Sequence, residues 1–101
     1  LAVNLAVQAN ACTVTIGCNK DDEAAFPDCR MAFLQLFNTM LTTAEVKVEV
    51  CAPFLEWTKA KIKRYASDVD ITLNDIWTCY RGGEKPCGEC PACKKLETAL
   101  A

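Results

Sequence analysis

Residues 79–93 read Cys-Tyr-Arg-Gly-Gly-Glu-Lys-Pro-Cys-Gly-Glu-Cys-Pro-Ala-Cys, a stretch rich in glycine and proline with little apolar core of its own. Its cysteines stand in the pattern Cys-x7-Cys-x2-Cys-x2-Cys. A Cys-x2-Cys turn lets two sulfurs converge on one ion, and four thiolates fill the tetrahedral shell of a structural zinc ion. The spacing therefore predicts a closed zinc site, which stabilises structure and does no catalysis. The predicted ligands are Cys79, Cys87, Cys90 and Cys93.

Two other uses of these cysteines stay open. A Cys-x2-Cys-x2-Cys run also begins the bacterial iron–sulfur pattern, but the fourth cysteine followed by proline is missing downstream. Disulfides are the second alternative, although cysteines two or three residues apart are poorly placed for unstrained bridges. The remaining thiols lack ligand spacing, and we expect Cys12 and Cys51 to pack in the core as small apolar residues. These remaining thiols are Cys12, Cys18, Cys29 and Cys51.

The composition describes one small domain without the usual base of nucleophilic catalysis. Its 101 residues are 51% hydrophobic, enough for a single modest core, and a net charge of -2 gives no general attraction to nucleic acid or anionic membrane. The absence of histidine excludes Ser-His-Asp and Cys-His arrangements and mixed Cys/His zinc sites. No secretion signal and no membrane-length apolar run is recognisable, so we expect a soluble, cytoplasmic protein.

Two short strands are expected in the first half of the chain. Residues 12–16, Cys-Thr-Val-Thr-Ile, are β-branched and predict a buried strand that follows a helix over residues 1–10 ended by Asn10. Residues 46–50, Val-Lys-Val-Glu-Val, alternate between apolar and charged, as expected of a strand nearer a sheet edge.

Three further helices are expected. Asp28 can cap a helix that runs through about Leu41, and Thr58 can cap another that runs to about Ser67. Residues 94–101 are a short helix candidate. Helical spacing predicts an inner stripe of Leu1 and Leu5 on the first helix and of Phe33, Phe37, Met40 and Leu41 on the second.

Residues 17–27 are acidic and loop-like, and they leave the carboxyl end of the first predicted strand. In open α/β sheets, ligands bind at this edge. Cys29 follows at an expected helix start, where the helix dipole can lower the pKa of a thiol, so a nucleophilic Cys29 is an alternative to a packed one. Because no histidine can act as its base, Asp28 and Arg30 are the better polar candidates.

Two long motifs cover much of the chain. Residues 17–30 read Gly-Cys-Asn-Lys-Asp-Asp-Glu-Ala-Ala-Phe-Pro-Asp-Cys-Arg, and residues 77–93 read Trp-Thr followed by the cysteine-rich stretch. They resemble the G-x-N-x-x-D-x-x-x-[YF]-P-D-C-R and W-[ST]-C-Y…C-G-x-C-x-x-C motifs of the 7-cyano-7-deazaguanine synthase family of queuosine biosynthesis. Residues 52–59 are similar to that family's P-[LF]-x-x-x-[ST]-K connection.

The resemblance implies an ATP-dependent ligase that makes a nitrile from 7-carboxy-7-deazaguanine and ammonia. The carboxylate is adenylated, ammonia displaces AMP to give an amide, and a second activation yields the nitrile. Arg30 could then pair with a carboxylate and Asp28 could accept from a guanine-like N–H edge. A plain helix cap for Asp28, a surface position for Arg30 and turn roles for the other two residues remain alternatives. By position, the implied substrate residues are Asn19, Asp22, Asp28 and Arg30.

The resemblance also implies an α/β fold, a partial Rossmann-like parallel sheet of the adenine nucleotide alpha hydrolase kind followed by a helical zinc segment. Residues 1–56 would belong to the nucleotide-binding core and residues 57–101 to the zinc-binding region. The family's S-G-G-x-D-S phosphate-binding signature does not occur in the sequence. We therefore expect an amino-terminal half to bind ATP, this chain to be inactive alone, and exposed sheet edges to favour homo-oligomers.

A function of another class is a non-catalytic zinc module that binds a protein or nucleic acid. The length of the chain and the closed metal site support it. Direct nucleic-acid binding is not expected from the net charge, and catalytic residues are not identified by the sequence.

Overall fold

The computed structural model describes residues 1–100 of the chain and side chains as far as Thr98. The chain divides into two compact units. We call Leu1–Thr58 the sheet unit and the part that begins at Lys59 the cysteine unit. Each contains its own group of buried residues.

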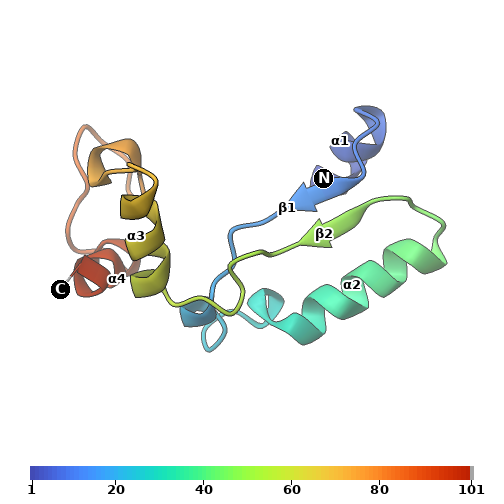
Figure 1. The fold of residues 1–101 in the computed structure, drawn as a ribbon, viewed down its shortest axis with the longest axis horizontal. Helices are drawn as coiled ribbons and strands as arrows, with labels where there is room; N and C mark the ends of the chain where they lie inside the picture. Colours follow the sequence, from blue (N-terminus) through green and yellow to red (C-terminus); the bar gives the residue numbers. More distant parts are fainter. Residues whose placement is uncertain (101) are drawn as a thin grey trace. The chain divides into compact units, whose positions relative to one another are not determined.

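The sheet unit is built on two parallel strands joined by a helix (Figure 1). Pairing runs from Thr13 opposite Glu49 to Thr15 opposite Cys51. Parallel strands need a crossover connection of this kind, which an α-helix usually provides. The order is α1 (Ala2–Gln8), β1 (Thr13–Thr15), the 3₁₀ turns η1 (Lys20–Asp22) and η2 (Pro27–Cys29), α2 (Met31–Thr43) and β2 (Glu49–Cys51).

β1 lies within the predicted residues 12–16, whereas β2 overlaps the predicted residues 46–50 only at Glu49 and Val50 and ends one residue later, at Cys51. Val48 and Val50 are buried while Lys47 and Glu49 are exposed, as the alternation indicated. The prediction of a wholly buried first strand is wrong, because both threonines of β1 are exposed. Cys12 lies just outside β1 and is exposed, so its expected place in the core is also wrong.

Asn10 ends α1 as predicted. It adopts a left-handed φ of 54°, and its backbone N–H donates to the carbonyl of Val7 at 3.2 Å. Asparagine tolerates this conformation, which turns the chain out of a helix and satisfies carbonyls of the last turn. The helix then leads directly to β1.

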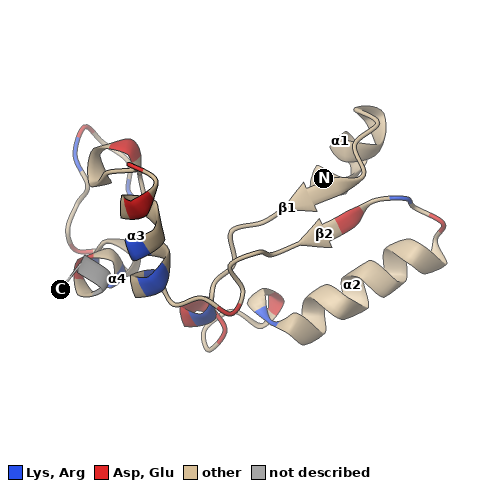
Figure 2. Cartoon of the chain, viewed as in Figure 1, with Lys and Arg blue, Asp and Glu red and all other residues tan. Residues whose placement is uncertain are grey.

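The predicted inner faces of the two helices are shifted. On α1, Leu5 is exposed and Ala6 is buried. On α2, Leu34 replaces Phe33 and Met40 as the inward residue beside Leu41. Neither helix has a charged residue (Figure 2), and apolar residues cover a wide sector of each helix, so the sequence left the phase of the buried stripe open. The resulting core consists of Leu34, Leu41, Val50 and Leu55.

The expected helix cap at Asp28 is wrong. Pro27 begins the turn η2, in which the N–H of Arg30 donates to the carbonyl of Pro27 at 3.3 Å. Arg30 is extended and is the cap residue of α2, without a side-chain cap bond. Proline is favoured at the first position of a helical turn, so the chain completes this turn before α2 starts.

Asn38 of α2 forms hydrogen bonds with the backbone of β2 at the strand edge that faces away from β1. Its Nδ2 donates to the carbonyl of Val50 at 2.9 Å, and its Oδ1 accepts from the N–H of Val50 at 2.8 Å. Glu49 and Cys51 direct their backbone groups to β1, so Val50 directs its own to the opposite side. The side-chain amide therefore takes the place that a further strand would occupy, which blunts this edge.

The cysteine unit is helical. It contains α3 (Lys59–Asp68), the 3₁₀ turn η3 (Leu73–Asp75) and α4 (Pro91–Leu100), and α3 contacts α4. The start of α3 directly after Thr58 agrees with the prediction. α4 begins three residues earlier than predicted, and the predicted end at residue 101 lies outside the described residues. Within residues 1–100, no helix has the length and apolarity needed to cross a membrane.

Replacing Leu34 by alanine should destabilise the sheet unit by about 2–4 kcal/mol, since a buried leucine leaves a cavity. Leu36 on the same helix is 72% exposed, whereas Leu34 is 6% exposed. Leu36→Ala should therefore change the free energy of unfolding by no more than about 0.5 kcal/mol. Urea unfolding of both variants measures the difference, and equal losses would contradict the assigned face of α2.

Asn38→Ala should cost about 1–3 kcal/mol, because the backbone groups of Val50 lose both partners. Gln35→Ala on the exposed surface of α2 is the matched control and should be nearly neutral. The same urea titration, read beside light scattering, should also show more self-association for Asn38→Ala. A neutral Asn38→Ala variant would show that the edge of β2 does not depend on this amide.

Candidate functional site

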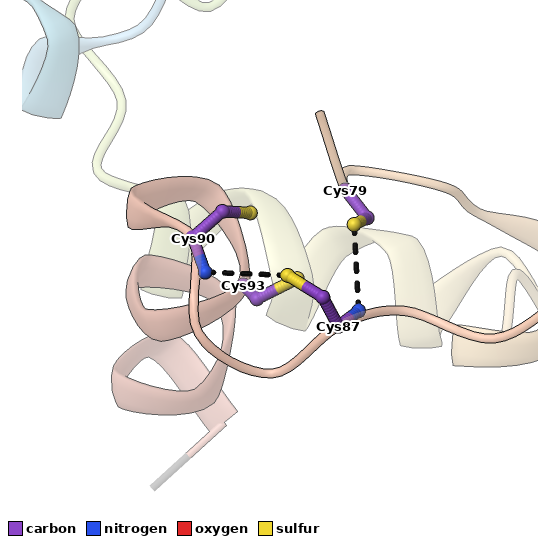
Figure 3. A group of neighbouring side chains, drawn as sticks. All are labelled: Cys79, Cys87, Cys90 and Cys93. Atoms are coloured by element: carbon purple, nitrogen blue, oxygen red, sulfur yellow. Dashed lines mark hydrogen bonds between the residues drawn. The ribbon is translucent and has the colours of Figure 1, made fainter. Parts of the chain in front are cut away.

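The four cysteines of residues 79–93 lie together in the cysteine unit (Figure 3). Their sulfur atoms all lie within 4.8 Å of one another. Cys93 lies in the first turn of α4 and Cys90 immediately precedes this helix, while Cys79 and Cys87 come from the loop before it. Three of the four are buried and Cys87 is half-buried.

Backbone N–H groups direct the sulfurs of this cluster. The Sγ of Cys79 accepts from the N–H of Cys87 at 3.4 Å, and the Sγ of Cys87 accepts from the N–H of Cys90 at 3.3 Å. Gly88, between the last two, has a φ of 72°, which glycine adopts without steric cost. The turn that joins Cys87 to Cys90 depends on this conformation.

Three cysteines of the cluster have shifted pKa values, in different directions. Backbone hydrogen bonds from Tyr80 and Cys93 lower the pKa of Cys90 to about 6. Backbone hydrogen bonds from Cys87 and Arg81 lower the pKa of Cys79. Burial, followed by the hydrogen bond with Cys90, raises the pKa of Cys93 to about 12. At neutral pH these values favour the thiolate of Cys90 and the protonated thiol of Cys93.

The cluster fits a tetrahedral metal ion. Four sulfurs at about 2.3 Å from zinc lie about 3.8 Å apart, and the sulfurs of Cys87 and Cys93 are 4.0 Å apart. All eight cysteines are free thiols, so the disulfide alternative is wrong for the described structure. Among residues 59–98 of this unit, the buried ones are cysteines of the cluster itself, with half-buried Cys87 and Ala92 beside them. These residues could hold a metal ion, and its identity stays a prediction.

The second motif, residues 17–30, forms the loop between β1 and α2. The N–H of Lys20 donates to the carbonyl of Trp57 at 3.0 Å, which ties this loop to the segment that follows β2. The loop therefore lies where both parallel strands end, at the edge where open α/β sheets bind ligands.

Asn19 is 6% exposed and makes its hydrogen bonds inside the loop. Its Nδ2 donates to Oδ2 of Asp22 at 2.8 Å, and its Oδ1 accepts from the N–H of Asp21 at 3.1 Å. This is an Asx-type turn at the start of η1. The side chain of Asn19 orients the carboxylate of Asp22.

The other two predicted substrate residues are exposed. Asp28 lies in η2, and Arg30 follows it. The Nε of Arg30 donates to the carbonyl of Glu23 at 2.9 Å, which restrains the guanidinium group at its Nε end. Asn19 and Asp22 thus touch each other, while Arg30 is anchored to the backbone of the same loop.

Sequence reasoning missed the partner of Cys29. The thiol of Cys18 donates to the sulfur of Cys29 at 3.4 Å. The pKa of Cys29 is raised to about 11, first by burial, then by Cys18 and by the charges of Asp28 and Asp22. The alternative of a Cys29 thiol whose pKa is lowered by the helix dipole is therefore wrong. A spacing of eleven positions carries no signal of this contact, which depends on how the loop folds.

Comparison with known proteins identifies, for the whole chain, the family that its two motifs resemble. The family model described as "Queuosine biosynthesis protein QueC" matches residues 1–101. A 7-cyano-7-deazaguanine synthase of Hahella chejuensis is 39% identical over 99 residues, which cover 96% of this chain and 43% of that protein. One of Haloarcula marismortui is 37% identical over 97 residues, covering 92% of this chain and 41% of that protein.

A third relative, a 7-cyano-7-deazaguanine synthase of a Synechococcus strain, is 31% identical over 106 residues, which cover 99% of this chain and 47% of that protein. The chain thus spans somewhat less than half the length of these relatives. With a family model that matches every residue, this chain belongs to the family of the queuosine biosynthesis protein QueC.

Proposed function

We propose that residues 1–101 supply the substrate loop and the zinc region of a 7-cyano-7-deazaguanine synthase. Such an enzyme is an ATP-dependent ligase that converts 7-carboxy-7-deazaguanine and ammonia to the nitrile in the cytoplasm. The observation that carries the proposal is the position of the motif loop, residues 17–30, at the carboxyl ends of both parallel strands. Family membership adds the reaction class to this geometry.

In this proposal the loop recognises the polar groups of a deazapurine. A guanidinium group presents a planar fork that pairs with a carboxylate through two hydrogen bonds, so we assign Arg30 to the carboxylate of the substrate. Its Nε bond to Glu23 holds the side chain in the loop. Asp22 and Asp28 are assigned to N–H donors of the base, with Asn19 as the residue that positions Asp22.

ATP activates the substrate carboxylate, because adenylation turns a poor leaving group into a good one. The phosphates need a cradle of backbone amides, and we assign that cradle to the part of the relatives that this chain does not match. In this division, residues 1–56 complete the nucleotide-binding sheet and residues 57–101 form the zinc-binding region.

The metal is proposed to be zinc, in a structural role. Four thiolates leave no position open for water or substrate, and zinc favours this ligand set. The ion neutralises sulfurs that would otherwise repel one another inside a small space. It also replaces the apolar core that the cysteine unit lacks, because the cluster supplies the buried residues of that unit.

Zinc affinity should fall as the pH falls. Zinc binds thiolates, so the proton of Cys93, whose pKa is raised to about 12, is displaced on binding. The apparent dissociation constant should therefore rise at least about tenfold for each pH unit between pH 8 and pH 6.5. The slope should steepen near pH 6, where Cys90 also takes up a proton. Competition with a chromophoric chelator measures this dependence.

Cys90→Ser and Cys51→Ser are a matched pair for this titration, because Cys51 lies in β2 of the sheet unit. Cys90→Ser should weaken zinc binding strongly and Cys51→Ser should leave it unchanged. Equal effects, or an affinity that does not vary with pH, would contradict the four-thiolate site. A brown protein that contains iron would instead indicate an iron–sulfur cluster at this site.

Ligase activity is best tested in a chimera. Residues 1–101 would replace the matched region of the Hahella chejuensis relative, which then supplies its own first half. The chimera should form the nitrile from 7-carboxy-7-deazaguanine, ammonia and ATP, measured by liquid chromatography and mass spectrometry. Arg30→Lys should lower kcat/KM by about 10- to 100-fold, because an ammonium group cannot make the bidentate contact.

Arg64→Lys is the control, since Arg64 is an exposed residue of α3 outside the motif loop. Its kcat/KM should stay within about twofold of the parent chimera, as expected for an exposed substitution. A folded, zinc-containing chimera that neither consumes ATP nor forms nitrile would contradict the ligase proposal. That result would leave the non-catalytic zinc module as the function of this region.

A further inference from the structure

A second pair of cysteines lies together outside the metal cluster. Cys18 follows β1 and Cys29 ends η2, eleven positions further along the chain. The thiol of Cys18 donates to the sulfur of Cys29 across 3.4 Å. Both side chains are half-buried, and Cys18 packs against the core of the sheet unit.

The loop between the two cysteines is held in place by hydrogen bonds within it and to the segment that follows β2. Asn19 binds Asp22, the N–H of Lys20 binds the carbonyl of Trp57, and Arg30 binds the carbonyl of Glu23. These contacts start beside Cys18 and finish beside Cys29. The approach of the two sulfurs is therefore part of the folded loop, and it does not require either end to move through the core.

We propose that Cys18 and Cys29 form an intramolecular disulfide when the protein meets a small-molecule disulfide. The sulfurs must come closer by about 1.4 Å to reach a bond length of about 2.05 Å, which modest side-chain rotations can provide. Other cysteines of the sheet unit lack this arrangement. Cys12 is exposed before β1, and Cys51 lies in β2.

The reaction is two successive thiol–disulfide exchanges. The thiolate of Cys18 attacks one sulfur of the small disulfide, whose S–S bond breaks and releases one small thiolate. The thiolate of Cys29 then attacks Sγ of Cys18, and the second small thiolate leaves. The protein loses two thiol protons and two electrons, and the small disulfide is reduced to two thiols.

The burial of Cys29 and the acidic groups around it set this order. Burial raises its pKa to about 11, and the acidic groups that face it are Cys18, Asp28 and Asp22. At neutral pH Cys29 is a thiol and a slow attacker of free disulfides. Once Cys18 carries the mixed disulfide, the attack by Cys29 is intramolecular. The proximity of the two sulfurs then compensates for the small fraction of Cys29 that is thiolate.

The disulfide closes the loop that carries Asn19, Asp22 and Asp28 and ends next to Arg30. Its effect on substrate binding rests on the proposed function, whereas the bond itself does not. Formation of the bond is measured by mass, so its failure and a failure of the ligase proposal are distinguishable.

The test uses the full chain loaded with Zn(II), which keeps the cluster sulfurs occupied, and oxidised glutathione as the small disulfide. Trypsin without reductant cleaves after Lys20 and Arg30, so Cys18 and Cys29 fall in different peptides. We expect a cross-link between peptides 1–20 and 21–30, and an intact mass lower by about 2 Da for the two hydrogens lost.

Three variants assign the bond, because peptide 1–20 also contains Cys12. Cys12→Ser should keep the cross-link and Cys18→Ser should lose it. Cys29→Ser should instead accumulate one glutathione on Cys18, as the resolving thiol is absent. The proposal is overturned if Cys29 pairs with Cys12 or Cys51, or if the wild-type pair stays reduced while the exposed Cys12 becomes glutathionylated.

Discussion

Four sulfurs that converge within 4.8 Å are the constraint on which the cysteine unit depends. Most of its described larger apolar side chains, among them Ile71, Leu73, Trp77 and Tyr80, are exposed, so they contribute little to a compact core. Thiolates brought this close repel one another unless a cation lies between them. Backbone N–H groups at Cys87 and Cys90 lower the cost of negative sulfurs but cannot balance four of them. A metal ion held by these four sulfurs would therefore contribute directly to the folding of this unit.

In the sheet unit, a small apolar core is bordered by polar groups that hydrogen-bond the backbone. The Asn38 amide takes both backbone groups of Val50, so the outer edge of β2 is closed and extension of the sheet is favoured past β1. At the carboxyl ends of the strands, Asn19 and Lys20 hold the motif loop in place. A loop positioned by rigid strands suits recognition of a small polar ligand.

Local patterns predicted most of what the structure contains. The Cys-x2-Cys spacing indicated the sulfur cluster, Asn10 the end of α1, and the alternation of residues 46–50 a half-buried strand. These signals work because each depends on neighbours within one turn or one strand. The family motifs supplied the rest of the identification.

Most of the wrong predictions concern contacts that depend on distant residues, whereas the cap at Asp28 failed for a local reason. Asp28 looked like a cap, but Pro27 starts a separate turn before α2. The predicted inner face of α2 is wrong because apolar residues cover a wide sector of this helix, and packing against the two-stranded sheet selects Leu34. The contact between Cys18 and Cys29 and the amide of Asn38 on Val50 arise from the fold of the loop and the crossover, which no short spacing encodes.

Zinc-edge X-ray absorption of the protein purified with its metal is the most direct measurement of the central claim. The four-thiolate site predicts a first shell of four sulfur atoms at about 2.3 Å and no nitrogen or oxygen ligand. A shell with fewer sulfurs, or with water completing it, would contradict a closed structural site on Cys79, Cys87, Cys90 and Cys93.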